Sequence, residues 1–380
     1  MFINSPMLLS YNPLEACIFT KQRNRLSKIF MHYFFILKKR LLTFVFFLCV
    51  IMLCGCSAKE EVVISGKTMG TTWHVKIVTG YFKDTDRLKS DIETRLQAIS
   101  QSMSTYRRES EISRFNALKS KVKKFFPSDD FFEVMRVAEK IYLLTNGAWD
   151  GTIEPLVNIW GFGSGRSPGT KEAPDSDEIE KILTKTGFNN IIISDKRFFL
   201  KQRAYITVDL ASIAKGYAVD AVAQEIKAHG IRNFLVEIGG EVLGAGVKQN
   251  QGKWRVGINT PEKNALPNSV YKIIRLENKA MATSGDYRNF FEINGNQYSH
   301  VIDPKTGYPV QNNVVSVSII ADTCAFADGL ATGVMVMGHK KGLELVNSLD
   351  NVECLIVVRT VQGLLTDYYS KGFKEFFVEH

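Results

Sequence analysis

Six runs of β-branched and apolar residues fill the second half of the chain and most limit what it can fold into. They lie at residues 234–238, 254–258, 272–276, 290–293, 314–321 and 354–358, and each has the length and composition of a strand. Asn294 and Gly295 predict a hairpin turn after the fourth run. Between the last two runs, residues 325–337 and 341–349 have helical periodicity, with Gly338 as a break. Strands and helices therefore mix without a regular βαβ repeat, which predicts an α+β fold.

The first half adds helices and shorter strands. Apolar residues recur at helical spacing over residues 84–100, 128–144 and 213–228. Another helix is predicted to begin near Asp175, with Glu178 placed for a capping box. Strands are predicted at residues 62–64, 73–78 and 205–208. Residues 191–194 and 198–200 are predicted to pair as a hairpin. The length of 380 residues and the hydrophobic content of 45% are sufficient for one large core.

The N-terminal segment has the pattern of a bacterial export signal. Basic residues 38–40 (KKR) precede an apolar run from Leu41 to Cys54, which is too short for a comfortable membrane span. The run ends in residues 53–56 (LCGC), which resemble the lipoprotein box whose last cysteine, here Cys56, is lipidated. The alternative is an uncleaved anchor helix. A start at Met31 would give a signal of ordinary length, so residues 1–30 are a candidate for a misassigned start.

This pattern predicts three parts: a leader (residues 1–55), a lipidated tether (56–61) and a globular domain (62–380). It also predicts a lipid-anchored protein on the extracytoplasmic face of a membrane, with the inner membrane favoured over the outer. The leader carries seven basic residues and one acidic residue, so only +3 of the formal net charge of +9 belongs to the rest. A nucleic-acid partner is therefore not expected.

After cleavage, the chain would keep three cysteines: Cys56, Cys324 and Cys354. Cys324 and Cys354 either pair in an oxidising compartment or remain as buried thiols. No cysteine or histidine spacing suggests zinc.

Residues 327–332 (ADGLAT) offer a candidate metal site. On a helix, Asp328 and Thr332 are four residues apart and share one face. A carboxylate and a hydroxyl are hard oxygen ligands, which suit Mg²⁺ or Ca²⁺ better than zinc. The alternative is that both are ordinary helix residues.

Residues 208–220 (VDLASIAKGYAVD) join a predicted strand to a predicted helix. Such a turn exposes backbone N–H and C=O groups that can hold a phosphate or complete a metal site. Lys215, placed in the first helical turn, is unfavourable for the helix dipole. It is therefore either a surface lysine or a cation that meets an anion.

Residues 298–309 (YSHVIDPKTGYP) and 283–287 (TSGDY) are the other polar segments. His300 precedes a turn that starts at Asp303, and either residue could act as a base if it reaches an attacking hydroxyl. Residues 283–287 are expected to form a loop between strands. Met69 and Tyr106 lie in further segments rich in small polar residues, and an aromatic ring there could stack on a planar ligand.

Taken together, these segments resemble the ApbE family, the FAD:protein FMN transferases. The resemblance extends from about Gly66 to Gly372. The matching segments are residues 68–72 (TMGTT), 103–106 (MSTY), 110–116 (SEISRFN), 147–150 (GAWD), 155–161 (PLVNIWG), 208–220, 236–241 (VEIGGE), 283–286 (TSGD), 299–307 and 327–332.

The resemblance implies an α+β, T-fold-like architecture with mixed or antiparallel sheets and flanking helices. It also implies FAD as the substrate and Mg²⁺ as the required ion. By the family pattern, the metal ligands are the carbonyl of Ser212 and the side chains of Asp328 and Thr332. The residues implied to line the FAD site are Met69, Tyr106, Ala148, Trp149, Asp150, Asp209, Lys215 and Ile302.

The sequence departs from the family pattern at two positions. Many members have a second acidic residue three positions after the first metal-binding aspartate, where this chain has Ala331. One metal ligand is therefore missing or replaced by water. Trp149 stands where phenylalanine is common, and its ring should still pack on the cofactor.

The implied reaction transfers FMN from FAD to a threonine or serine hydroxyl of an acceptor flavoprotein, such as a redox-pump subunit, and releases AMP. His300 is the preferred base, with Asp286 and Asp303 as competitors. One alternative is an FAD pyrophosphatase, in which water is the nucleophile. Another is a non-catalytic FAD-binding lipoprotein, which the alanine at position 331 keeps open. A purely structural lipoprotein is disfavoured by the density of site motifs.

Overall fold

The computed structural model describes residues 25, 30–46, 59–80, 84–162, 173–262, 264–266, 269–285, 290–293 and 296–378. The chain divides into two units, Met1–Ala58 and Lys59–His380. In the first unit, residues 30–46 form a helix. Within the described ranges, no helix has both the length and the apolarity needed to cross a bilayer. Cys56 lies outside the described residues, so its predicted lipidation stays a prediction.

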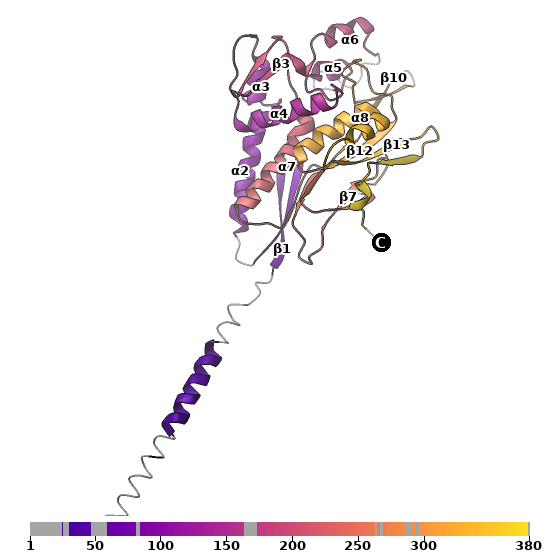
Figure 1. Ribbon diagram of the computed structural model, residues 1–380. Coiled ribbons are helices and arrows are strands. Elements are labelled where there is room, and N and C mark those ends of the chain that lie inside the picture. Colours follow the sequence, from indigo (N-terminus) through magenta and orange to yellow (C-terminus); the bar gives the residue numbers. More distant parts are fainter. Residues whose placement is uncertain are drawn as a thin grey trace, which may run out of the picture. The chain divides into compact units, whose positions relative to one another are not determined.

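The second unit contains the strands and the remaining helices of the described chain (Figure 1). The strands are β1 (Lys59–Thr68), β2 (Thr71–Gly80), β3 (Ile191–Ser194), β4 (Phe198–Lys201), β5 (Phe234–Ile238), β6 (Glu241–Ala245), β7 (Trp254–Asn259), β8 (Val270–Leu276), β9 (Lys279–Gly285), β10 (Phe290–Ile293), β11 (Asn296–Ser299), β12 (Val314–Ala321), β13 (Glu353–Arg359) and β14 (Leu365–Tyr369). The helices are α2 (Thr85–Met103), α3 (Glu111–Ala117), α4 (Asp129–Leu144), α5 (Glu154–Ile159), α6 (Ser176–Leu183), α7 (Ala211–Ala228) and α8 (Cys324–Val346), with 3₁₀ turns η1 (Phe188–Asn190) and η2 (Phe373–Phe376).

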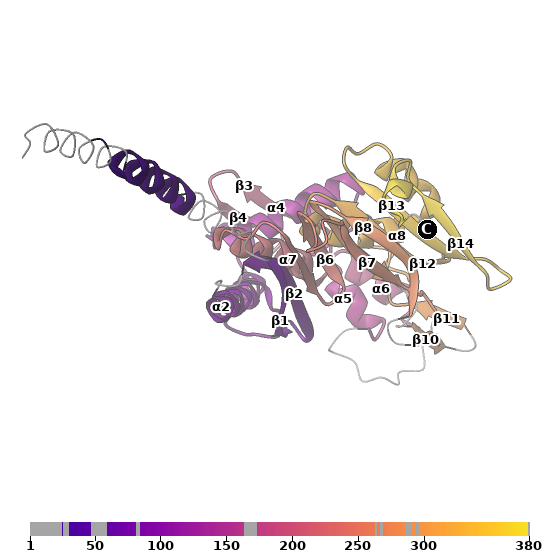
Figure 2. The same ribbon diagram turned by 90° about the horizontal axis from the view of Figure 1, so that it is seen from below.

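An eight-stranded sheet in the order β1-β2-β5-β6-β9-β12-β13-β14 is the centre of the fold. Every neighbouring pair in it is antiparallel. Figure 1 shows α2, α7 and α8 lying along one face of this sheet, and Figure 2 shows α2 beside the β1–β2 hairpin. The predicted α+β fold with antiparallel sheets and flanking helices is confirmed.

Alternate residues of the strands enter different cores, because successive side chains of a strand point to opposite faces. In β13, Cys354 and Ile356 pack with α8, whereas Leu355 and Val357 pack on the opposite face with β8 and η2. Both faces of this strand are therefore buried, which explains its almost continuous apolar sequence.

The β1–β2 hairpin closes with a two-residue turn made by Met69 and Gly70, since Thr68 pairs with Thr71. Both turn residues have positive φ, 47° for Met69 and 74° for Gly70. Such turns match the twist of the strands but normally select asparagine or glycine at the first position. Local backbone preference therefore does not explain why methionine occupies position 69.

The two helices predicted after residue 324 are present and follow each other as the two halves of α8. Gly338 interrupts α8 with φ 79° and ψ 169°, so the predicted break is confirmed and the chain continues as helix on both sides. Asn294 and Gly295 lie outside the described residues. The strands that flank them are antiparallel, with Ile293 opposite Asn296.

Two local predictions were wrong. Residues 205–208 are not a strand, because the side-chain amide of Asn116 takes the place of a neighbouring strand. It accepts from Val208 N and donates to Val208 O, both at 2.8 Å. Residues 283–285 are not a loop, because they belong to β9 and pair with residues 316–318 of β12.

Candidate functional site

Two adjoining cavities lie at the N-terminus of α7. One, of about 560 Å³, lies between this helix end, the end of α2 and the β1–β2 turn. The other, of about 480 Å³, lies between the same helix end, α5, α8 and residues 300–302. Their common wall consists of Thr105, Tyr106, Asp209 and Ala211. Each volume falls in the range of ligand sites, and together they could take the two ends of an elongated ligand.

The structure brings all eight residues of the predicted FAD site to these cavities. The first cavity contains Met69 and Lys215, the second contains Ala148, Trp149, Asp150 and Ile302, and both contain Tyr106 and Asp209. Tyr106 is 88% exposed, so one face of its ring is open for contact. The sequence motifs are thus far apart along the chain but meet in one place.

The N-terminus of α7 is poorly capped. Leu210 is the cap residue and offers no side-chain hydrogen bond. Asp209 Oδ1 accepts from the N–H of Ala211 at 2.8 Å, and burial raises the pKa of Asp209. The N–H groups of Ile213 and Ala214 donate to the carbonyl of Leu210, at 2.9 and 2.8 Å. Among the described residues, the N–H of Ser212 has no hydrogen-bond partner. Such an end favours an anionic ligand through N–H donors and the helix dipole.

Asp150 is mainly a structural residue of the cavity wall. Its carboxylate accepts from the N–H and hydroxyl of Thr152, at 2.7 and 2.6 Å, and from the N–H of Phe188 at 3.0 Å. Burial raises its pKa, although these hydrogen bonds oppose the change. The neighbouring Trp149 donates from Nε1 to Ser212 Oγ at 2.9 Å. The indole is thereby fixed against the start of α7.

The three predicted metal ligands come from α7 and α8. Ser212 and Thr332 line the second cavity, and Thr332 Oγ1 lies 3.0 Å from Ser284 Oγ of β9. Asp328 is buried and accepts from Gly216 N at 3.0 Å. In a regular helix the N–H of Gly216 donates to the carbonyl of Ser212, four residues earlier. The Asp328 carboxylate and the Ser212 carbonyl are therefore alternative acceptors for the same N–H. The carboxylate and the carbonyl are therefore neighbours.

These donors suit a hard divalent cation. A carboxylate, a hydroxyl and a carbonyl are oxygen ligands of the kind that Mg²⁺ takes together with water or phosphate oxygens. Burial raises the pKa of Asp328 to about 7, while nearby Lys215 opposes this rise. A cation beside the carboxylate would favour its charged form. Ala331 of α8, which departs from the family pattern described above, is fully buried in the core.

Helices α7 and α8 hold each other by reciprocal contacts. Asp328 of α8 accepts from Gly216 of α7, and Asp220 of α7 accepts from Cys324 N and Ala325 N at the start of α8, at 2.8 and 2.9 Å. The backbones are very close there, since a Cβ on Gly216 would lie 2.3 Å from the Cys324 oxygen. This contact fixes the relative position of the ligands on the two helices. Cys324 and Cys354 are buried free thiols.

Lys215 lies in the second turn of α7, not the first, because the helix begins at Ala211. Its Nζ forms an ion pair with Glu241 Oε1 at 2.5 Å. Burial lowers the pKa of Lys215, but the carboxylates of Asp328 and Glu241 outweigh burial and raise this pKa above its usual value. The lysine therefore meets protein carboxylates and is not an isolated surface cation.

The three candidate bases have different positions. His300 lines the second cavity together with Ser212 and Thr332, and its ring lies 6.2 Å from that of Phe162. Asp303 lines neither cavity, and its Oδ1 accepts from Lys305 N at 2.9 Å within a turn. Asp286 lies outside the described residues. Of the two described candidates, only His300 reaches the cavity wall.

Sequence reasoning missed several residues of the site. Glu154 and Asn158 line the second cavity from α5, and burial raises the pKa of Glu154. Ser284 contacts Thr332, and Glu241 holds Lys215. Glu241, Ser284 and Asn158 belong to matched family motifs but were given no role, because spacing along one chain does not show which strand lies behind a helix.

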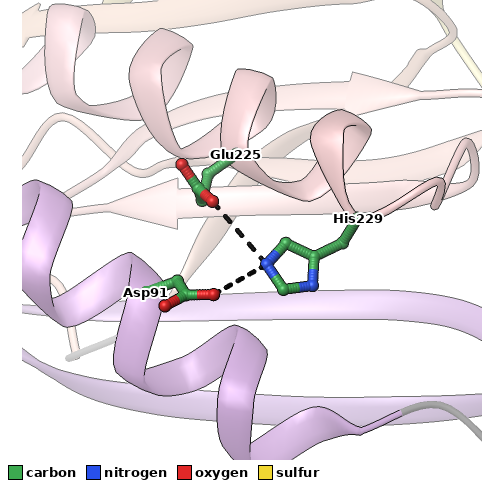
Figure 3. A group of neighbouring side chains, drawn as sticks. All are labelled: Asp91, Glu225 and His229. Atoms are coloured by element: carbon green, nitrogen blue, oxygen red, sulfur yellow. Dashed lines mark hydrogen bonds and ion pairs between the residues drawn. The ribbon is translucent and has the colours of Figure 1, made fainter.

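A separate group of ionisable residues lies at the far end of α7 (Figure 3). His229 Nε2 is 2.9 Å from Asp91 Oδ2 and 3.6 Å from Glu225 Oε1. Arg87 Nε also approaches Asp91, at 3.8 Å. His229 ends α7 and Asp91 belongs to α2, so these contacts hold the two helices together.

Comparisons with known proteins identify the family. A sequence model of the ApbE family matches residues 69–356. The chain is 40% identical over 329 residues to a protein of Vibrio cholerae named FAD:protein FMN transferase, covering 86% of this chain and 96% of that one. It is 37% identical over 330 residues to a protein of the same name from Haemophilus influenzae, covering 85% and 94%.

Solved structures give the same result. The flavin transferase ApbE from Vibrio cholerae matches with a TM-score of 0.76 and 39% identity, over 84% of this chain and 100% of that one. The apo form of the flavinyl transferase ApbE from Pseudomonas stutzeri matches with a TM-score of 0.74 and 35% identity, over 84% and 97%. The sequence match, the fold and the convergence of the motifs on one site place this chain in the ApbE family.

Proposed function

We propose that this protein is an FAD:protein FMN transferase, which moves FMN from FAD to a serine or threonine hydroxyl of an acceptor protein. The observation that carries the proposal is that Ser212 and Thr332 line the second cavity, while the buried carboxylate of Asp328, one helical turn before Thr332, contacts Gly216 N of α7. The names of the relatives support the same reaction. The two cavities suit the two ends of FAD, and the α7 N-terminus between them suits its diphosphate.

The proposed reaction is a single displacement at the FMN phosphorus. The acceptor hydroxyl oxygen forms a bond to that phosphorus, the bond to the bridging oxygen breaks, and AMP leaves with that oxygen. A nitrogen of His300 takes the hydroxyl proton. Bound Mg²⁺ would neutralise charge on the diphosphate. Lys215 adds a second positive charge at the wall of the first cavity, and the exposed ring of Tyr106 offers a surface to a planar part of FAD.

Asp328→Asn tests the proposal. The variant should lose FMN transfer by on the order of 100-fold or more, because an amide cannot supply the charge that a metal ligand needs. Transfer is measured by mass spectrometry of an acceptor domain after incubation with the full chain, FAD and Mg²⁺. The matched control is Asp322→Asn, an exposed carboxylate just before α8 that pairs with Lys279, and it should transfer normally.

The same assay separates the alternative functions. AMP release that is equally fast without acceptor would show an FAD pyrophosphatase. FAD binding without AMP release or acceptor labelling would show a non-catalytic binding protein. Either result, or full transfer by Asp328→Asn, contradicts the proposal.

We also propose that Cys56 carries a lipid and holds the protein on the extracytoplasmic face of the inner membrane. The observation behind this is the basic and apolar leader that ends in residues 53–56. Cys56→Ala should move the protein from the membrane fraction to the soluble extracytoplasmic fraction, as judged by fractionation and labelling with a fatty-acid analogue. Cys54→Ala is the control, because it keeps a small residue before Cys56. Labelling that persists in Cys56→Ala contradicts the proposal.

A further inference from the structure

Glu241 is a buried carboxylate with only part of its hydrogen-bonding capacity used. The residue is 3% exposed at the start of β6. Oε1 pairs with Lys215 Nζ, while Oε2 is buried without a hydrogen-bond partner among the described residues. A buried charge is costly unless it is paired. Packing alone therefore does not explain why a carboxylate is buried at this position.

The turn before β6 places Glu241 behind the lysine. Gly239 and Gly240 connect β5 to β6 with φ values of 64° and 107°. A Cβ on Gly239 would lie 2.9 Å from Thr71 Cγ2 and 3.4 Å from Lys215 Cδ. The lysine stem thus passes over a glycine, and its ammonium meets Glu241 at the end of that path. Glu241 itself lines neither cavity, so it can act on a ligand only through Lys215.

The pair leaves the ammonium able to bind a ligand. An ammonium has three N–H donors, and the contact with Glu241 Oε1 uses one of them. Lys215 lines the first cavity and its side chain is 32% exposed. A long lysine side chain loses much rotamer freedom on binding, so holding it beforehand lowers the entropy cost of contact with an anion.

We propose that Glu241 is a positioning residue, which fixes the Lys215 ammonium at the cavity wall to meet the diphosphate of the substrate. This rests on the proposed function, since FAD supplies the diphosphate. Glu241 contacts neither substrate nor metal in this scheme. It determines where the lysine charge lies, and so how tightly the free enzyme takes up a dinucleotide.

The test measures FAD affinity and transfer separately, with the full chain and Mg²⁺. Glu241→Gln should weaken FAD binding about tenfold, as followed by calorimetry without acceptor. Glu241→Asp should recover part of the loss, because it keeps the charge. Glu237→Gln is the matched control: it removes a carboxylate from β5 near the same turn, where Glu237 pairs with His74 and accepts from Gly240 N. It should bind FAD normally.

A double-mutant cycle separates positioning from a general structural role. If Glu241 acts through Lys215, Glu241→Gln should have little further effect on FAD affinity in a Lys215→Met background. Equal losses in both backgrounds, or unchanged affinity in Glu241→Gln, overturn the proposal. Wild-type transfer of FMN to the acceptor is measured in parallel, so a failure of the proposed function would be seen in the wild type and not confused with a failure here.

Discussion

Asp220 caps the start of α8 from another helix. Thr323, the cap residue in sequence, makes no side-chain cap hydrogen bond, and the carboxylate of Asp220 accepts from Cys324 N and Ala325 N instead. Burial raises the pKa of Asp220 to about 6, despite these two hydrogen bonds. The carboxylate therefore has good hydrogen-bond geometry as a cap, but its burial makes the charged form energetically unfavourable.

This residue should make stability depend on pH. The folded-state pKa lies above the unfolded value, so between about pH 4 and 6 the native state holds a proton that the unfolded chain has lost. The contribution of Asp220 to stability is thus largest below this window and falls as pH rises through it. The free energy of unfolding of wild type minus that of Asp220→Asn should decrease by about 2 kcal/mol from pH 4 to pH 7. Denaturant titrations at both pH values measure this, and a constant difference contradicts it.

At the scale of residues, the sequence predicted which residues lie near the site better than it predicted their contacts. The motifs of residues 208–220 and 327–332 identified Asp209, Lys215, Asp328 and Thr332, and the structure places them around one end of α7. The partners of these residues could not be predicted. Lys215 meets Glu241 and Asp328 meets Gly216 only because three distant segments pack together.

At the scale of elements, the crossing of α7 and α8 depends on glycine. The backbone of α8 fills the space that a side chain on Gly216 would need. The Cys324 oxygen would lie 2.3 Å from an ideal Cβ at this position. In an exposed helix, alanine would be favoured over glycine by about 1 kcal/mol. At this position the close approach should reverse that preference.

Gly216→Ala should lower the free energy of unfolding by about 2–4 kcal/mol, because the helices must separate or shift. It should also weaken Mg²⁺-dependent FAD binding, since the Gly216 N–H that contacts Asp328 moves with α7. Thermal melts and calorimetry measure the two effects. Gln224→Ala, at an exposed position of the same helix, should change stability by no more than about 0.5 kcal/mol. A stabilised Gly216→Ala protein would show that the close contact is not required.

The elements that the sequence predicted are those with strong periodicity, such as α2, α4 and β12. The strands that the sequence did not predict owe their conformation to tertiary packing and not to local composition. β6 and β9 contain glycine, alanine and polar residues, and they are strands because both of their faces are covered. Gly244 of β6, for example, leaves room for the side chain of Trp254. Residues 205–208 have the composition of a strand, but the backbone of Val208 forms its hydrogen bonds with the side-chain amide of Asn116 and not with another strand.

At the scale of the whole molecule, the unit Lys59–His380 contains the described cores and both cavities. A shortened chain that begins at Lys59 should therefore keep the melting temperature of the mature protein within about 2 °C. Its FAD affinity, measured by calorimetry, should also be unchanged. A lower melting temperature or a weaker affinity would mean that the preceding residues take part in the fold or the site.

If Cys56 carries the proposed lipid, the first hairpin limits which acceptors the protein can reach. Lys59 opens β1 three residues after Cys56, and the turn at Met69, at the other end of the strand, belongs to the first cavity. A ten-residue strand is about 30 Å long. If the lipid is attached at Cys56, three residues and this strand limit the distance from the lipid surface to the turn at Met69 to at most about 40 Å. Acceptors would then need their modified hydroxyl within that height of the lipid surface, which disfavours targets carried on tall, rigid stalks.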